Sequence, residues 1–409
     1  MEPVLFPDDT SFWFETLRVL GATAYGGADI GEVLTTAQAI TAGDYDSWYD
    51  EWLATADRVA AEAEKALAAG HFVSARDGLM RASNYYRSAD FYLHGNPRDP
   101  RISHAYTRAR ETFIAAAALL DPPVEPIEIP YESTVLHGYF YPADRRNSGG
   151  PIPTIIMHSG FDGTCEEMHW LGAAAAQERG YNVVTFDGPG QPAALHFDGL
   201  VFRADWEHVV TPVLDWTLLR PDVDPNKVAL YGASMGGLLA PRAAAYEHRL
   251  AACIAFDGVY DMGLTAAAWV PGDRAEIEAM LRADSAPEAD AAIDQLMATN
   301  PNIRWAATHG QYALGIDSPR ALFAAFLDYT LAGGVAEQIT CPTLVCEAAS
   351  DIFFEGQPQL LFDHLSCPKT LLKFTDAEGA GAHCQVGAGR LAFARIFDWL
   401  DETLAVSAG

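Results

Sequence analysis

The chain has 409 residues, of which 50% are hydrophobic and 20% charged, and a formal net charge of −29 at pH 7. This composition excludes a disordered chain, and the length exceeds what one hydrophobic core usually needs, so we expect a second domain. The negative charge argues against nucleic acid or a membrane surface as a partner and favours a small molecule. The sequence shows neither a signal peptide nor a long apolar run, which predicts a cytoplasmic protein.

The first part of the chain is predicted to be helical. Over residues 10–120 the apolar side chains recur at helical spacing, as Trp48, Trp52 and Ala56 do, with almost no strand pattern. We therefore predict an all-helical N-terminal domain over residues 1–121.

The second part, residues 122–409, alternates strands and helices. An antiparallel pair over 125–131 and 136–141 opens it. Buried-type strands then follow, separated by helices, which indicates a mostly parallel eight-stranded sheet with flanking helices. These strands are expected at 154–157, 182–186, 228–231, 252–256, 343–346 and 370–374. Between about 262 and 335, alanine-rich helical stretches replace the next strand, and we interpret them as an inserted helical cap.

A nucleophile motif lies between a strand and a helix. The strand at 228–231 runs into Gly232-Ala233-Ser234-Met235-Gly236, and helix-forming residues follow. This G-x-S-x-G turn is typical of the α/β-hydrolase fold, where small neighbours permit a strained backbone that lifts the serine hydroxyl above the sheet. We therefore predict that Ser234 is the attacking residue.

A serine hydroxyl needs a base and an acid, which follow in the order serine, acid, histidine in this fold. His383 lies in a glycine-rich loop after the last strand and is the predicted base. Asp351 follows the penultimate strand and is the favoured acid, whose task is to orient the imidazole. Asp257, after the strand that follows the nucleophile helix, is the alternative acid.

The oxyanion hole is expected from two backbone N–H groups. One belongs to Met235, and the other comes from the loop after the strand at 154–157, near Gly160 or Phe161, with Phe161 favoured. No cofactor and no metal are expected. A Gly-x-Gly-x-x-Ala match at 188–193 contains two prolines that remove N–H donors a dinucleotide would need.

Aromatic side chains are dense in both helical regions. A lid made of them would favour an aromatic or polyketide-like ligand. The candidate pocket residues are Tyr85, Tyr86, Trp305, His309 and Tyr312.

Several segments together resemble one branch of the α/β hydrolases, the relatives of 2,6-dihydroxypseudooxynicotine hydrolase and of fungal polyketide chain-shortening hydrolases. The matching segments are 81–87, 158–164, 186–191, 205–207, 232–237, 341–344 and 378–385. The resemblance implies a homodimer, an N-terminal domain that serves as lid and dimer contact, and hydrolysis of a carbon–carbon bond next to a ketone. Ser159 replaces a glycine of the family pattern, and Pro192 follows Gly190-Gln191 where relatives carry glycine.

Two other classes of function remain open. The same three residues would serve an ester, lactone or thioester hydrolase, or an acyltransferase, because the acyl bond is chosen by the lid. A ligand-binding receptor that keeps the pocket without turnover is the more remote alternative.

Overall fold

A computed structural model describes residues 2–144, 150–267 and 273–406. Its centre is an eight-stranded sheet with the order β1-β2-β4-β3-β5-β6-β7-β8. The pairs β1–β2 and β2–β4 are antiparallel, and the other neighbouring pairs are parallel. The strands are β1 (Glu125–Tyr131), β2 (Thr134–Tyr141), β3 (Ile152–His158), β4 (Asn182–Phe186), β5 (Val223–Ala233), β6 (Ala252–Phe256), β7 (Thr343–Ala348) and β8 (Lys369–Phe374).

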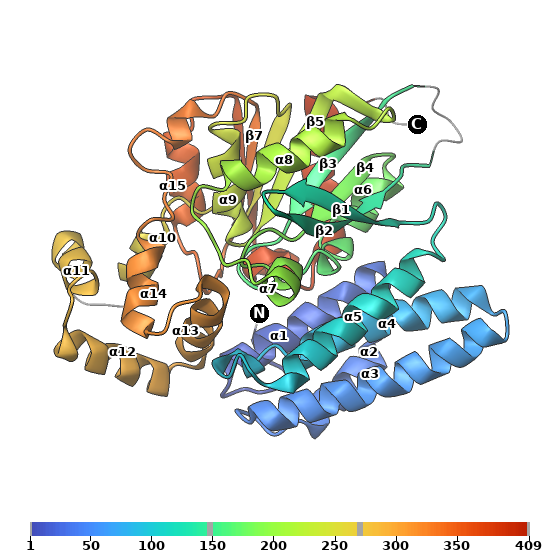
Figure 1. The fold of residues 1–409 in the computed structure, drawn as a ribbon, viewed down its shortest axis with the longest axis horizontal. Coiled ribbons are helices and arrows are strands. Elements are labelled where there is room, and N and C mark those ends of the chain that lie inside the picture. Colours follow the sequence, from blue (N-terminus) through green and yellow to red (C-terminus); the bar gives the residue numbers. More distant parts are fainter. Residues whose placement is uncertain (1, 145–149, 268–272, 407–409) are drawn as a thin grey trace.

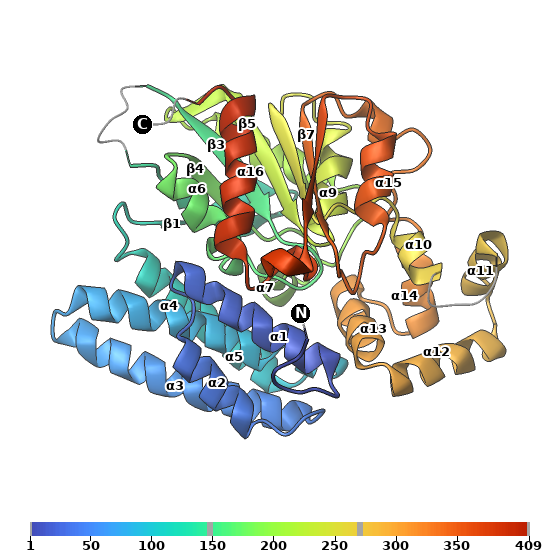
Figure 2. The same cartoon turned by 180° about the vertical axis from the view of Figure 1, so that it is seen from behind.

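Helices cover both faces of this sheet (Figures 1 and 2). One face packs against α6 (Ala173–Glu178) and α16 (Gly389–Thr403), and the other against α8 (Glu207–Leu218), α9 (Gly236–Ala244) and α15 (Gln357–His364). Strands β4 and β6 are buried at every position, which explains the uninterrupted apolar sequence of β6 and the mostly apolar sequence of β4. The topology confirms the predicted α/β-hydrolase fold.

The N-terminal helices form a bundle below the sheet in Figure 1. In α3, Asp44 accepts the N–H groups of the first turn, and one face buries Trp48 and Trp52 completely. The bundle comprises α1 (Thr10–Gly21), α2 (Ile30–Ala39), α3 (Tyr45–Ala68), α4 (Phe72–Ala89) and α5 (Pro100–Ala117).

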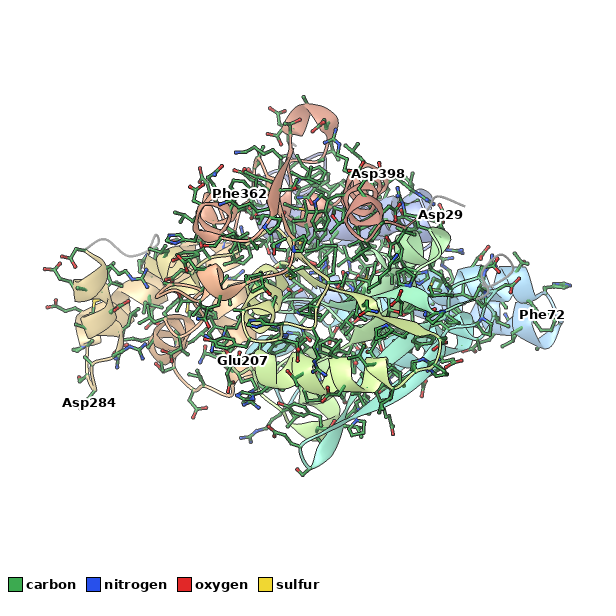
Figure 3. All side chains as sticks on the ribbon, turned by 90° about the horizontal axis from the view of Figure 1, so that it is seen from above. Asp29, Phe72, Glu207, Asp284, Phe362 and Asp398 are labelled. Atoms are coloured by element: carbon green, nitrogen blue, oxygen red, sulfur yellow. The ribbon has the colours of Figure 1, made fainter. Side chains whose placement is uncertain are left out.

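Further helices lie between β6 and β7. They are α10 (Met262–Ala267), α11 (Arg274–Leu281), α12 (Pro287–Thr299), α13 (Pro301–Leu314) and α14 (Pro319–Phe326). Three of them begin with proline. At this first helical position a backbone N–H has no acceptor within the helix, so proline, which lacks an N–H, costs no hydrogen bond. Figure 3 places Phe72 of the bundle and Asp284 of this insertion at opposite ends of the molecule.

The two helical regions meet beside the carboxyl ends of the parallel strands. Trp305 of α13 stacks on Phe91, which follows α4, with ring centroids 4.9 Å apart. The remaining short helix, α7 (Pro192–Asp198), lies at the same edge of the sheet. In the described part of the chain, no helix is both long and apolar enough to cross a bilayer.

Candidate active site

Ser234 stands on a sharp turn between β5 and α9. Its φ is +61°, a left-handed conformation that serine rarely adopts, and its N–H donates to the Phe256 carbonyl at 2.9 Å. A Cβ at Gly232 would lie 2.1 Å from the Gly236 carbonyl oxygen, so only glycine fits there. The geometry is that of a nucleophile elbow, with the N-terminus of α9 directly behind the hydroxyl.

A chain of buried hydrogen bonds leads away from this hydroxyl. Nε2 of His383 lies 2.8 Å from Oγ of Ser234, and Nδ1 of His383 lies 2.8 Å from Oδ2 of Asp351. The three residues come from separate loops at the carboxyl edge of the sheet, and the side chains of His383 and Asp351 are 6% and 2% exposed. The structure thus brings together the three residues that the sequence singled out.

Both candidate acids reach the same imidazole nitrogen. Oδ2 of Asp257 lies 3.1 Å from Nδ1 of His383 and also accepts the N–H of Cys384, while Oδ1 of Asp257 accepts from Nε2 of Gln385 at 2.7 Å. Oδ1 of Asp351 accepts the backbone N–H groups of Phe353 and Phe354 at 2.8 and 3.0 Å.

The two carboxyl groups differ in charge. Burial and the nearby Asp351 raise the pKa of Asp257. Burial also acts to raise the pKa of Asp351, but attraction to His383 and two N–H donors lower it below its usual value. Burial would lower the pKa of His383, yet the Asp351 carboxylate raises it well above the usual range. Asp351 is therefore the carboxylate best suited to hold the imidazole.

The loop after β3 lies against the elbow. A Cβ at Gly160 would come within 2.6 Å of the Ala233 oxygen and of the Met235 nitrogen. In the part of the chain that the structure describes, the N–H groups of Phe161 and Met235 donate to no protein acceptor. Both residues line the cavity beside Ser234, so these two donors are free for a ligand there.

Hydrogen bonds within this loop and from Gln191 hold it in place. Ser159 donates through its hydroxyl to the Gly163 carbonyl, which closes the loop on itself. Nε2 of Gln191 donates to the carbonyl oxygens of Ser159 and Gly160 at 2.8 and 3.1 Å. Pro192 is the first residue of α7, where proline is favoured. The two departures from the family pattern therefore have local structural roles, one bracing the loop and one starting a helix.

An apolar cavity opens over Ser234. It spans about 880 Å³ of space, which includes open solvent at its mouth. The N-terminal bundle, the inserted helices and the loops that carry Ser234, Gly160 and His383 all contribute to its wall. Its aromatic lining consists of Phe14, Phe161, Trp305, Phe326, Phe353 and Phe354. An apolar, largely aromatic lining suits a small molecule with an aromatic or long apolar part.

The five predicted pocket residues lie in different environments. Trp305 lines the cavity. Nε2 of His309 lies 2.8 Å from the Phe161 carbonyl and supports the loop, while burial lowers the pKa of His309 to about 3 and keeps it neutral. Tyr312 lies 3.0 Å from Nδ1 of His196.

Tyr85 and Tyr86 lie elsewhere. Their hydroxyls donate to Glu32 and Asp57 inside the N-terminal bundle, away from the cavity lining, so we do not retain them as pocket residues. Helical spacing of aromatic residues shows that a face is buried but leaves open what it packs against.

The sequence did not predict that residues of α1 line the cavity. Phe14, Glu15 and Arg18 line the cavity although they lie more than two hundred residues before the elbow. The available signal was a pair of opposite charges, three residues apart, in the mostly apolar stretch from Phe12 to Val19.

Two groups of described residues bring possible metal ligands within 4.8 Å of one another. The first, Asp257, His383 and Cys384, is already engaged with Ser234. The second, Cys165, Glu166 and Asp187, is fully buried, and Glu166 accepts the hydroxyl of Tyr139. We assign a metal to neither group.

Comparison with known proteins places this chain in a family. The model of a family described as "Esterase FrsA-like" matches residues 31–268. The chain belongs to the FrsA-like esterases. Among its relatives, the hydrolase LUC6 of a Fusarium species is 38% identical and 98% of each chain is covered. The 20-hydroxy-prefusarin hydrolase FUS2 of Gibberella moniliformis is 37% identical, with 97% of each chain covered.

A solved structure shares the fold. The crystal structure of 2,6-dihydroxy-pseudo-oxynicotine hydrolase superposes with a TM-score of 0.72 at 24% identity, covering 95% of this chain and 97% of that one. This FrsA-like esterase is therefore an enzyme of the hydrolase class with the α/β-hydrolase fold, and the resemblance seen in its sequence is confirmed.

Proposed function

We propose that this FrsA-like esterase is a serine hydrolase that cleaves a carbon–carbon bond next to a ketone in an aromatic, β-dicarbonyl substrate. The observation that carries the proposal is the hydrogen-bonded chain from Ser234 through His383 to Asp351 at the wall of an apolar cavity. A buried base aligned with a strained serine is the arrangement that nucleophilic acyl transfer requires.

The reaction begins with attack of Ser234 on a substrate carbonyl while His383 takes the hydroxyl proton. The N–H groups of Phe161 and Met235 hold the resulting oxyanion. The carbon–carbon bond then breaks, its electron pair forms an enolate on the leaving fragment, and His383 returns the proton to the enolate carbon. Water, activated by His383, releases the acid from the acyl-serine.

The lining of the cavity supports this choice of substrate. Rings of Phe14, Trp305 and Phe353 would stack on an aromatic or conjugated ligand. The name of one relative, a 20-hydroxy-prefusarin hydrolase, supports a natural-product substrate for this chain as well.

Hydrolysis of an ester is the second candidate function. The family that matches the chain is described as esterases, and the same elbow and oxyanion donors would serve an ester, a lactone or a thioester, or acyl transfer to an alcohol. The two candidates differ in the leaving group, which is a carbon acid in one and an oxygen or sulfur acid in the other.

A turnover screen separates them. Benzoylacetone as the β-diketone, p-nitrophenyl acetate, a lactone and an acyl thioester would be offered to the wild type and to Ser234→Ala. We expect cleavage of the diketone by the wild type and none by the variant. Turnover of esters alone would favour the second candidate, and substantial activity of Ser234→Ala would contradict the covalent scheme.

We further propose a cytoplasmic homodimer formed through the N-terminal helices. The six cysteines are buried and unpaired, as in proteins of a reducing compartment. Phe72 and Val73 at the start of α4 are exposed by 59% and 63%, which supports a contact there. Sedimentation velocity of the wild type and of Phe72→Ser tests the dimer.

A further inference from the structure

A buried ionic cluster forms one wall of the substrate cavity. At its centre, Arg18 of α1 donates to Asp162 at 2.6 Å and, through two nitrogens, to Glu167 at 2.6 Å each. Arg87 of α4 lies 3.6 Å from the Glu167 carboxylate. The fifth member is Glu15, one turn before Arg18, with a side chain only 6% exposed.

Glu15 is the least compensated carboxyl of this cluster. In the described part of the chain, its oxygens contact only Nη1 of Arg18, at 3.4 and 3.5 Å, whereas Asp162 and Glu167 hold Arg18 by short bonds. Two guanidinium groups thus face three carboxyl groups. A third carboxylate in this setting would be a buried charge without its own partner, which is strongly unfavourable.

The surrounding groups agree with a proton on Glu15. Attraction to Arg18 offsets burial and lowers the pKa of Asp162 and of Glu167, so both stay ionised. Burial raises the pKa of Glu15 to about 7, with Asp162 adding to the rise and Arg18 opposing it. Tyr92, which also faces Glu15, has its pKa raised by burial and stays neutral.

Glu15 reaches the cavity that Ser234 and His383 also line. The other charged residues of the wall, Arg18 and Asp162, are already joined to each other. A protonated carboxyl beside an apolar cavity can donate one strong hydrogen bond to a ligand, and enzymes use such groups to stabilise an enolate.

We infer that Glu15 is a substrate-binding residue whose protonated carboxyl donates a hydrogen bond to a ketone oxygen of the substrate. This inference rests on the proposed carbon–carbon cleavage. The ketone is the one that remains on the leaving fragment, and its oxygen takes the negative charge when the bond breaks. Glu15 keeps its proton throughout, the bond to the oxygen strengthens as the charge develops, and the enolate carbon still receives its proton from His383.

The test compares two leaving groups. Cleavage of benzoylacetone produces an enolate, whereas cleavage of p-nitrophenyl acetate does not. For Glu15→Leu, which lacks any donor, we expect kcat for the diketone to fall about 100- to 1,000-fold, the usual effect of losing one donor to an oxyanion. Ester turnover should change less than about threefold, which is the size of effect that repacking of the side chains around residue 15 would cause by itself. Equal losses on both substrates would overturn the inference.

The pH dependence provides a second measurement on a milder variant, Glu15→Gln. Wild-type kcat/KM for the diketone should fall as the pH rises above about 7, because Glu15 then loses the proton it donates. The ester should show no such fall, and Glu15→Gln should abolish it for the diketone. Persistence of the fall in Glu15→Gln would contradict the role. Glu247→Gln is the matched control, since Glu247 is a buried carboxylate bound to Arg249 away from the cavity.

Binding separates this inference from the proposed reaction. Calorimetry of benzoylacetone with Ser234→Ala and with Ser234→Ala/Glu15→Leu needs no turnover. We expect at least a tenfold weaker affinity without Glu15, about 1.4 kcal/mol. Equal affinities would refute the contact whether or not the wild type cleaves the diketone. If the wild type does not cleave benzoylacetone but Ser234→Ala still binds it more tightly than Ser234→Ala/Glu15→Leu does, only the proposed reaction is refuted.

Discussion

The contact between Gly160 and the elbow predicts a large effect from a single methyl group. In Gly160→Ala the new Cβ would lie 2.6 Å from both the Ala233 oxygen and the Met235 nitrogen, and these are backbone atoms that cannot rotate away. The loop and the elbow must separate by about 1 Å to restore ordinary van der Waals contact. That displacement moves the Phe161 N–H away from the position where the oxyanion forms.

The expected loss follows from this displacement. Removing one oxyanion donor costs about 100- to 1,000-fold in kcat, or about 2.7–4 kcal/mol of transition-state stabilisation. The measurement is kcat and KM on p-nitrophenyl acetate together with the thermal unfolding midpoint, and we expect KM to change little.

A matched control is available in α2. A Cβ at Gly31 would meet only one side-chain oxygen of Asp29 at 3.8 Å, so Gly31→Ala should retain full activity. Wild-type kcat in Gly160→Ala would refute the assignment of the oxyanion hole. A similar loss in both variants would show that the effect is not specific to the loop.

Three further predictions follow from the buried charges. Asp351→Asn should lower kcat by about 10⁴-fold, because the amide would hold His383 in the wrong tautomer. Asp257→Asn should lower kcat much less, and equal losses would contradict the assignment of the acid. Since Asp351 raises the pKa of His383, ester kcat/KM should rise with pH through a range above the usual value of about 6.5, and Asp351→Asn should move that rise to lower pH, which a pH–rate profile would show. Arg18→Met should reduce the free energy of unfolding by about 3–5 kcal/mol because it leaves buried carboxylates unpaired, whereas Arg282→Gln, at an exposed ion pair, should change it by less than about 1 kcal/mol in urea titrations.

The hydrogen-bonded chain from Ser234 to Asp351 was predictable because its members have fixed places in this fold. Ser234 is recognised from a local pattern, and His383 and Asp351 each follow a strand that the apolar runs identify. The choice between Asp351 and Asp257 stayed open in the sequence, since both follow parallel strands and emerge at the same edge. In the structure both carboxyl groups reach Nδ1 of His383, and their distances, their other hydrogen bonds and the opposite directions of their pKa shifts distinguish them.

The substrate cavity was much less predictable. Tyr85 and Tyr86 share the helical spacing of residues that face a ligand, but the bundle itself covers them. Glu15 and Arg18 lie on a helix that the sequence predicts, yet nothing local shows that α1 packs over the elbow. The side of a helix that meets a cavity depends on how whole elements dock, and this involves contacts between distant residues.

The sequence by itself determined the fold class, the strands of the sheet and the serine turn, because these depend on local periodicity, on apolar runs and on glycines next to a strained residue. Only the tertiary structure decided which helices enclose Ser234 and which carboxyl of the cavity wall is least compensated by positive charge. The physical reason is that the charge of Glu15 depends on Arg18, one turn away, and on three groups from distant parts of the chain. Only their packing brings two guanidinium groups and three carboxyls into one buried cluster.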